Sequence, residues 1–295
     1  MEIGSYEKEK EVISGFRVIH RNKRYSCFYM MMIYIRCNVM KRVLCLIVGV
    51  VVLVAGCSTV PKDVVFQTST IDALLAGVYD GDMSFGELLK HGDFGIGTFD
   101  HLDGEMVLLD GTVYQVKSDG KIYTPKKSVN TPFATVCRFT PENDASIKSG
   151  SSYDAVKILI DEIAPNQNLF CAIKISGQFE AMKTRSVPAQ SKPYPALKIV
   201  TSNQPEFEMR DISGTIVGFR CPAYVKGINV PGYHLHFISS DRTQGGHILS
   251  FEIAEAECAV DVLNEYYLTL PLYTKEFAET DLSKDRSKDL REVEQ

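Results

Sequence analysis

The fold is indicated most directly by residues 95–116, which read GIGTFDHLDGEMVLLDGTVYQV. Apolar residues recur here with a period near two, which is typical of β-strands. The dipeptides Asp103-Gly104 and Asp110-Gly111 favour tight hairpin turns. We therefore predict antiparallel strands at 95–99, 105–109 and 112–116.

Similar strand-like segments continue along the chain, with few helical segments between them. We expect a helix from Ser84 to Gly92, because serine caps a first turn and glycine readily takes the left-handed position after a last turn. A second helix opens at Ser151 and stops before Pro165, since proline disfavours helical geometry in the residue ahead of it. The further strand-like segments are 134–139, 169–175, 178–187, 214–220, 232–239, 247–254, 258–263 and 266–270. This pattern predicts an α+β fold, with mixed and antiparallel β-sheets and a few helices in a strand-rich body.

The polar stretch at 201–205 divides this body into two expected parts. The first is an N-terminal α/β domain at 70–200, and the second is a β-rich C-terminal domain at 201–295. The charged end of the second part, 280–295, fits either a helix or a tail.

Residues 1–57 have the pattern of a leader. Two basic residues precede an apolar run at 43–55, which is too short for a comfortable membrane span, and Gly56-Cys57 follows. This resembles a lipoprotein signal peptide at 40–56 that is cleaved before a lipidated Cys57. We expect the body to be exported and lipid-anchored to the bacterial cell envelope, or else membrane-anchored by an uncleaved signal helix.

Two flanking segments complete this interpretation of the leader. Signal peptides are N-terminal, so residues 1–39 indicate a mis-assigned start and translation from Met40. On the other side, residues 58–69 are expected to form a linker to the body.

Composition excludes some classes of function. The chain has 295 residues, 45% of them hydrophobic, which is enough for a sizeable core. Its net charge is −5 and no lysine- or arginine-rich stripe runs through the body, so nucleic acid is not an expected partner. The cysteines of the body are widely spaced without a CxxC pair, which favours small core residues over a thiolate zinc site and leaves disulfide pairing open; they are Cys137, Cys171, Cys221 and Cys258.

The densest chemical signal is a group of histidines near the C-terminal end. His234 and His236 alternate within a predicted strand, so both side chains point to the same face. A returning strand after the turn-rich 239–246 would bring His247 close to them. Three imidazoles can bind a metal ion such as zinc and leave coordination positions open. Unrelated surface or hydrogen-bonded histidines are the alternative.

Three further residues have a functional and an ordinary interpretation. Glu105 alternates with apolar strand residues, which would bury its carboxylate, but it also follows a turn and could face solvent. Arg185 ends a strand, where a solvated arginine is the ordinary interpretation, but its planar fork suits a substrate carboxylate. Thr98 either donates a hydrogen bond near the site or is a plain strand threonine.

Several separated motifs, in order, resemble the α-acetolactate decarboxylase family across nearly all of the body. They are Gly92–Phe99 (GDFGIGTF), Leu102–Met106 (LDGEM), Lys183–Pro188 (KTRSVP), Gly232–Phe237 (GYHLHF) and Gly245–His247 (GGH). The lipoprotein-like leader departs from familiar members, which are often cytoplasmic.

The resemblance implies a set of site residues and a partner. It implies zinc held by His234, His236 and His247, with Glu105 and Arg185 in the active site. It also implies a glutamate from the C-terminal tail, for which Glu294 is preferred over Glu292. A homodimer is implied as well.

The expected activity is that of a carboxy-lyase. It is the zinc-dependent decarboxylation of 2-acetolactate (2-hydroxy-2-methyl-3-oxobutanoate) to acetoin and carbon dioxide. Zinc would stabilise the enediolate, Arg185 would hold the carboxylate, and Glu105 would supply the proton with help from the tail glutamate. The alternative is a non-catalytic surface lipoprotein that binds a metal or a small ligand.

Overall fold

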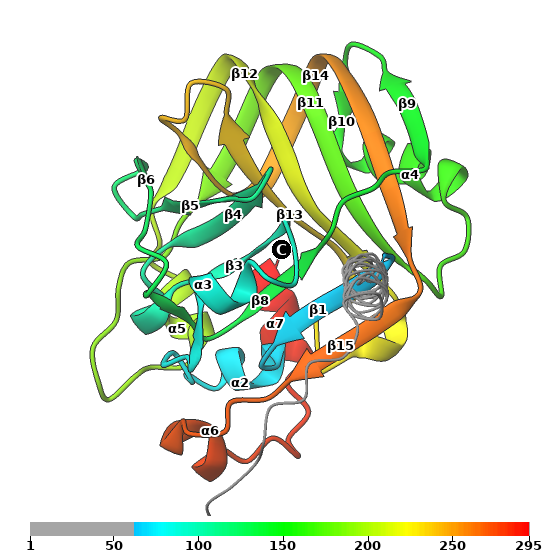
Figure 1. The fold of residues 1–295 in the computed structure, drawn as a ribbon. Helices are drawn as coiled ribbons and strands as arrows, with labels where there is room; N and C mark the ends of the chain where they lie inside the picture. The colour runs from blue at the N-terminus through cyan, green and yellow to red at the C-terminus, as the bar shows by residue number, and fades with distance from the viewer. Residues whose placement is uncertain (1–61, 295) are drawn as a thin grey trace, which may run out of the picture. The chain divides into compact units, whose positions relative to one another are not determined.

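Two β-sheets lie face to face in the computed structural model, which describes residues 62–294 (Figure 1). The first sheet has seven strands in the order β15-β1-β8-β3-β4-β5-β6. All its pairs are antiparallel except β1 with β15. Its strands are β1 (Val64–Thr68), β3 (Phe94–Thr98), β4 (Glu105–Leu109), β5 (Thr112–Val116), β6 (Ile122–Tyr123), β8 (Ala134–Cys137) and β15 (Glu265–Thr269). The three strands expected around residues 95–116 are confirmed as β3, β4 and β5.

The second sheet has six strands, and Figure 1 shows that β11, β12 and β14 are much longer than the others. Its strands are β9 (Asn143–Ile147), β10 (Ser151–Ser152), β11 (Phe170–Arg185), β12 (Glu206–Cys221), β13 (Gly232–Ser239) and β14 (Gly245–Leu263). Strand β13 pairs with β12 on one side and with the start of β14 on the other, while β14 also pairs with β11. The sheet therefore curls back on itself where β14 begins.

Some strands that the sequence divides are continuous in the structure. The segments expected at 169–175 and 178–187 are one strand, β11, and those at 247–254 and 258–263 are one strand, β14. The register between these two strands shifts near Gln178 and Phe179. Such bulges bend a strand without ending it, so a local break in the apolar pattern did not mark a loop.

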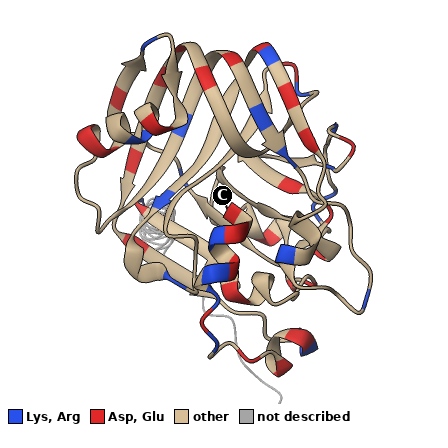
Figure 2. Ribbon diagram, turned by 180° about the vertical axis from the view of Figure 1, so that it is seen from behind, with Lys and Arg blue, Asp and Glu red and all other residues tan. Residues whose placement is uncertain are grey.

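Six α-helices and two 3₁₀ turns accompany the sheets among the described residues, and a two-stranded sheet pairs β2 (Met83–Ser84) with β7 (Asn130–Thr131). The α-helices are α2 (Ile71–Leu75), α3 (Phe85–Leu88), α4 (Tyr153–Ile163), α5 (Leu197–Thr201), α6 (Lys275–Glu279) and α7 (Ser287–Glu294). The 3₁₀ turns are η1 (Asp100–Leu102) and η2 (Ala223–Val225). The charged end of the chain is therefore partly helical, and Figure 2 shows basic and acidic positions interleaved along α7.

The helix expected from Ser84 to Gly92 is confirmed only at its start. The Ser84 hydroxyl accepts a hydrogen bond from the Glu87 amide, as a capping residue does, but α3 ends at Leu88. Gly92 is not in the left-handed region. It is needed for close packing instead, because a Cβ there would lie 2.6 Å from the carbonyl oxygen of Cys137.

The expected linker at 58–69 is wrong for its described second half. Residues 64–68 form β1, which pairs with both β15 and β8. Val65 and Phe66 are buried in the core on opposite faces of the first sheet. The polar residues around them hid a short strand whose pairing partner lies some 200 positions further along the chain.

The polar stretch at 201–205 does not separate two domains. It joins α5 to β12, and β12 pairs along its length with β11, which lies before the stretch. The described residues fall within one compact unit that begins at Pro61. A polar turn between a helix and a sheet strand has the same composition as a linker, so composition alone misplaced the boundary.

The main core lies between the two sheets. Residues of both sheets meet there, including Ile96 and Val107 from the first sheet and Val217 and Phe219 from the second. Helix α4 covers the other face of the second sheet through Val156 and Ile160. The four body cysteines are free and buried, as expected for small core residues.

The leader, its proposed signal peptide and Cys57 lie outside the described residues. Among residues 62–294, no helix is both long enough and apolar enough to cross a bilayer.

Candidate metal centre and active site

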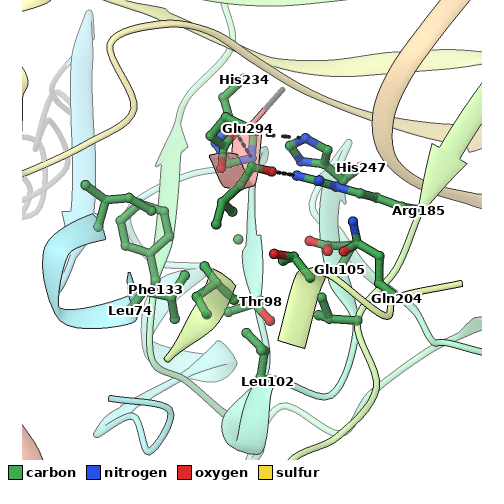
Figure 3. A pocket seen from close by; sticks show the side chains of 16 residues that line it. Leu74, Thr98, Leu102, Glu105, Phe133, Arg185, Gln204, His234, His247 and Glu294 are labelled. Atoms are coloured by element: carbon green, nitrogen blue, oxygen red, sulfur yellow. Dashed lines mark hydrogen bonds and ion pairs between the residues drawn. The ribbon is translucent and has the colours of Figure 1, made fainter. Parts of the chain in front are cut away.

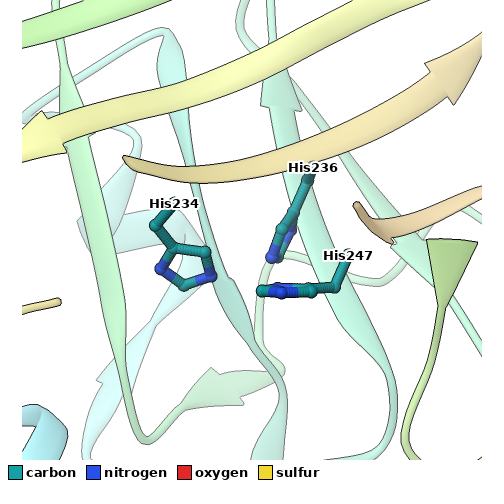
Figure 4. A group of neighbouring side chains, drawn as sticks. All are labelled: His234, His236 and His247. Atoms are coloured by element: carbon teal, nitrogen blue, oxygen red, sulfur yellow. The ribbon is translucent and has the colours of Figure 1, made fainter. Parts of the chain in front are cut away.

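Strand pairing brings the three histidines together, as their spacing predicted. His234 and His236 project from the same face of β13, and His247 lies directly opposite His236 at the start of β14. One potential ligand atom from each imidazole lies within 4.8 Å of the others, and the ring centroids are 5.1–5.4 Å apart. Figure 4 shows the three rings converging on one point.

The protonation of these rings suits a metal ion. The His236 Nδ1–H donates to the carbonyl oxygen of Met106 at 2.8 Å, which leaves a lone pair on Nε2. That Nε2 is buried and has no hydrogen-bond partner among the described residues. Burial, with a smaller contribution from the nearby Arg185 cation, lowers the pKa of all three imidazoles, that of His234 to about 3. Neutral imidazoles with converging lone pairs fit a cation with nitrogen preference.

Two carboxyl groups face the histidines from different elements. The Glu105 Oε2 atom lies 3.6 Å from Nε2 of His236. The Glu294 Oε2 atom lies 3.9 Å from Nε2 of both His234 and His247. Glu105 comes from the first residue of β4 and Glu294 from the last residue of α7 (Figure 3). The site is therefore assembled from both sheets and the C-terminal helix.

Both carboxyl groups are held in conditions that favour their protonated forms. Burial raises the pKa of Glu105 to about 8, against the lowering effect of Arg185 and with a further rise from Glu294. Burial raises the pKa of Glu294 to about 7, with Arg185 again opposing. A cation between the imidazoles would lower both values towards neutrality or below it. Groups that titrate in this range can donate and accept protons.

The two candidate tail glutamates differ in position. The Glu294 side chain is 15% exposed and faces the histidines, whereas the Glu292 side chain is 50% exposed and lies 3.8 Å from the ammonium group of Lys288. One helical turn of 3.6 residues places positions 292 and 294 about 200° apart, so only one of them can face the site.

Arg185 lies in the same cross-strand row as two of the histidines. It is the last residue of β11, opposite His247, which is in turn opposite His236. The guanidinium is buried and donates to the carbonyl oxygen of Val293 in α7. It makes no ion pair with a carboxylate among the described residues, so its charge remains available to an anion. Gly246 permits this row, because a Cβ there would lie 2.4 Å from the Arg185 carbonyl oxygen.

Thr98 positions the strand that carries Glu105. Its hydroxyl donates to the carbonyl oxygen of Gly104 at 2.7 Å, and Thr98 lies opposite Glu105 in the β3–β4 pair. The threonine thereby fixes the turn immediately before the glutamate. Its side chain also lines the cavity in front of the histidines.

A cavity of about 50 Å³ joins these groups. Thr98, Glu105, Arg185, His234, His247 and Glu294 line it (Figure 3). Apolar side chains close its other side, among them Leu74, Leu102, Phe133 and Val187. Gln204 and Thr201 also line it, and sequence reasoning assigned them no role, because they belong to the polar stretch interpreted as a boundary.

The groups around this cavity indicate the class of site. A buried three-imidazole centre, flanked by two carboxyl groups and a guanidinium, is of the catalytic metal-site class, since three protein ligands leave positions open for water or substrate.

Comparison with known proteins makes the assignment specific. The family model described as "Alpha-acetolactate decarboxylase" matches residues 65–284. A relative of that name from Methanosarcina mazei is 46% identical over 242 residues, covering 82% of this chain and 84% of its own length. One from Methylococcus capsulatus is 43% identical, covering 78% and 88%. The solved structure of alpha-acetolactate decarboxylase from Bacillus subtilis strain 168 is 38% identical, covers 78% of this chain and 99% of its own, and superposes with a TM-score of 0.76. The chain belongs to the alpha-acetolactate decarboxylase family.

Proposed function

We propose that this protein is a zinc-dependent decarboxylase that converts 2-acetolactate to acetoin and carbon dioxide. The observation that supports it most strongly is that the cluster of three imidazoles adjoins a single cavity, which His234, His247, Glu105, Glu294 and Arg185 line. The names of the relatives supply the substrate, and the nitrogen donor set favours zinc among common ions.

The three histidines would hold the ion, and its chemistry would be Lewis-acid stabilisation of the oxygen that gains charge as carbon dioxide leaves. Arg185 binds and orients the substrate carboxylate through its free N–H groups. The bond between C1 and C2 then breaks, and its electron pair is delocalised over C2, C3 and the former ketone oxygen.

Glu105 supplies the proton that completes the reaction. Its side chain is mostly buried, which raises the pKa of its carboxyl group, and it lies 3.6 Å from the imidazole of His236. Transfer of that proton to C2 gives acetoin. Glu294, which faces the other two histidines, is placed to return a proton to the site. The apolar wall keeps water from competing for the carbanion.

The test uses purified, zinc-loaded protein. We expect acetoin from racemic 2-acetolactate well above the spontaneous rate, loss of this activity after chelation, and recovery when zinc is returned. Stoichiometric zinc binding without acetoin would instead support the alternative, a non-catalytic metal- or ligand-binding lipoprotein.

The proposal extends to location and assembly. The pattern at 40–57 supports an exported, lipid-anchored protein that is translated from Met40 and carries its lipid on Cys57. Mass spectrometry of the native protein would contradict this if any peptide from residues 1–39 were present. The family resemblance supports a homodimer, which light scattering would detect.

A further inference from the structure

The segment between α5 and β12 forms part of the cavity wall, although its composition resembles a linker. It runs Thr201-Ser202-Asn203-Gln204-Pro205, and its two cavity-lining residues are Thr201 and Gln204. Figure 3 shows the Gln204 side chain on the same side of the pocket as Glu105 and Arg185. The function proposed above gives this side chain no task.

The backbone of the segment is fixed next to Arg185. The Ser186 amide donates to the carbonyl oxygen of Pro205 at 3.3 Å, and Glu206 lies opposite Arg185 in the β11–β12 pair. The Ser186 hydroxyl donates to the carbonyl oxygen of Val116, which lies opposite Glu105 in the β4–β5 pair. These contacts fix the position of the backbone next to Gln204 relative to Arg185 and Glu105.

The amide of Gln204 has an unmet hydrogen bond. Its Oε1 atom is buried and has no hydrogen-bond partner among the described residues. A buried acceptor without a donor is unfavourable, and proteins retain few of them. In a cavity that is also lined by a guanidinium without an ion-pair partner among the described residues, such an atom marks the place of a polar group on a ligand.

The chemistry of the substrate identifies that group. An amide oxygen can only accept a hydrogen bond. Ionised 2-acetolactate has one donor, its tertiary hydroxyl, because its carboxylate and ketone oxygens can only accept. The hydroxyl is attached to C2, next to the carboxylate that Arg185 binds, so the two protein groups would hold adjacent substrate groups.

We propose that Gln204 is a substrate-binding residue whose Oε1 accepts a hydrogen bond from the tertiary hydroxyl of the 2-hydroxy acid. It thereby selects 2-hydroxy-3-oxo acids over 3-oxo acids that lack the hydroxyl. Together with Arg185 it fixes the rotation about C2, so that the C1–C2 bond is aligned for electron delocalisation into the ketone. This proposal rests on the proposed function for its substrate.

Two ligands that cannot react separate the proposed hydrogen bond to Gln204 from the other contacts of the substrate. 2-Hydroxy-2-methylpropanoate carries the carboxylate and the tertiary hydroxyl, and 2,2-dimethylpropanoate replaces that hydroxyl with a methyl group. Calorimetric titration of each into zinc-loaded protein measures binding without turnover. The variants are Gln204→Leu and the unbranched Gln204→Met, with Asn203→Ala as a control, since Asn203 is exposed and its side-chain amide donates to the Ser202 hydroxyl.

We expect either Gln204 variant to weaken binding of the hydroxy acid by about 3- to 10-fold, the range for one neutral hydrogen bond, and binding of 2,2-dimethylpropanoate by less than about 2-fold. The kcat/KM for 2-acetolactate should fall at least as much, with zinc content unchanged. Equal weakening of both ligands, or no change in either, in a folded variant overturns the proposal. Absence of acetoin from the wild-type protein would overturn the proposed function alone, because the titrations do not depend on turnover.

Discussion

The site has two sides that the chain builds in different ways. The histidine wall, formed by His234, His236 and His247, stands on the paired strands β13 and β14. The cover, formed by α5, residues 202–205 and α7, consists of short helices and a turn. Within the cover, Leu290 and Val293 pack with Leu197 and Val200, and the ammonium of Lys198 lies 2.7 Å from the carboxylate of Asp289.

This difference separates two requirements of the chemistry. Metal ligands must keep fixed mutual distances, and the ladder of a β-sheet fixes them through backbone hydrogen bonds. Substrate must enter a cavity of only about 50 Å³, so some part of its wall must be easier to displace. Residues on short helices held by a few side chains meet that second requirement.

Changes in the histidine wall should have the largest effect. His236→Ala removes one of three ligands, so we expect loss of bound zinc and of activity together, exceeding the roughly 10–100-fold cost typical of losing only an outer partner of a ligand. Elemental analysis and acetoin formation measure the two losses. The control is His101→Asn, because His101 is exposed and asparagine tolerates its left-handed backbone. Full zinc occupancy in His236→Ala would contradict the metal site.

A substitution of Glu105 tests the part of the first sheet that faces the histidine wall. Glu105→Gln keeps the shape of the side chain but cannot release a proton, so turnover should fall by about 10²–10⁴-fold while zinc remains bound. Single-turnover kinetics with elemental analysis measure both quantities. An unchanged kcat would show that another group supplies the proton.

The C-terminal helix tests the cover. Glu294→Gln should lower kcat by about 10²-fold, the lower limit for a positioned acid or base, because its carboxyl group faces two histidines. Glu292→Gln is a matched control two residues away, and it should change kcat by less than about 2-fold, since its pair with Lys288 is exposed. Similar losses in both variants would mean that helix stability, and not the Glu294 carboxyl group, matters.

The smallest effect concerns stability at the other end of β14. Asp261 is fully buried; the Thr140 amide donates to one of its oxygens at 2.8 Å, and the other oxygen has no hydrogen-bond partner among residues 62–294. Burial raises its pKa to about 6, with contributions from Asp63, Glu142 and Asp93. The folded state therefore holds the proton more tightly than the unfolded chain does. Stability from this group is complete below about pH 4 and is lost as the pH rises through about 6.

Removing this carboxyl group should remove that dependence. Between pH 4 and 7, the Asp261 carboxyl group should lower the free energy of unfolding of the wild-type protein by roughly 1–3 kcal/mol. This contribution should be absent from Asp261→Asn when both proteins are unfolded in urea. Because Asp261 is remote from the site residues, acetoin formation should persist in the variant. Parallel pH curves for both proteins would show that Asp261 stays ionised throughout.

Local sequence patterns predicted much of the first sheet and the cluster of three histidines. Asp110-Gly111 marked the tight turn between β4 and β5, whereas Asp103-Gly104 ends a longer connection between β3 and β4 that includes η1. Alternation placed His234 and His236 on one face. These are short-range properties, fixed by side-chain period and turn geometry. Glu294, which lies near two of the histidines, was preferred over Glu292 through family resemblance and not through a local pattern, and its role stays a prediction.

Elements that depend on distant partners were missed or divided. Strand β1 lay inside the expected linker because its pairing partner, β15, is far away in sequence. The 201–205 stretch read as a boundary because nothing local reveals that Gln204 faces a cavity beside Arg185.

The sequence by itself determined the types of chemical group that this protein offers and which neighbouring residues share a face. Only the tertiary structure decided that Glu105 and Glu294, 189 positions apart in the chain, approach the same three imidazoles, and that burial raises the pKa of both carboxyl groups. The physical reason is that turn and strand propensities act over a few residues, whereas desolvation and the convergence of ligands depend on which surfaces the folded chain packs together.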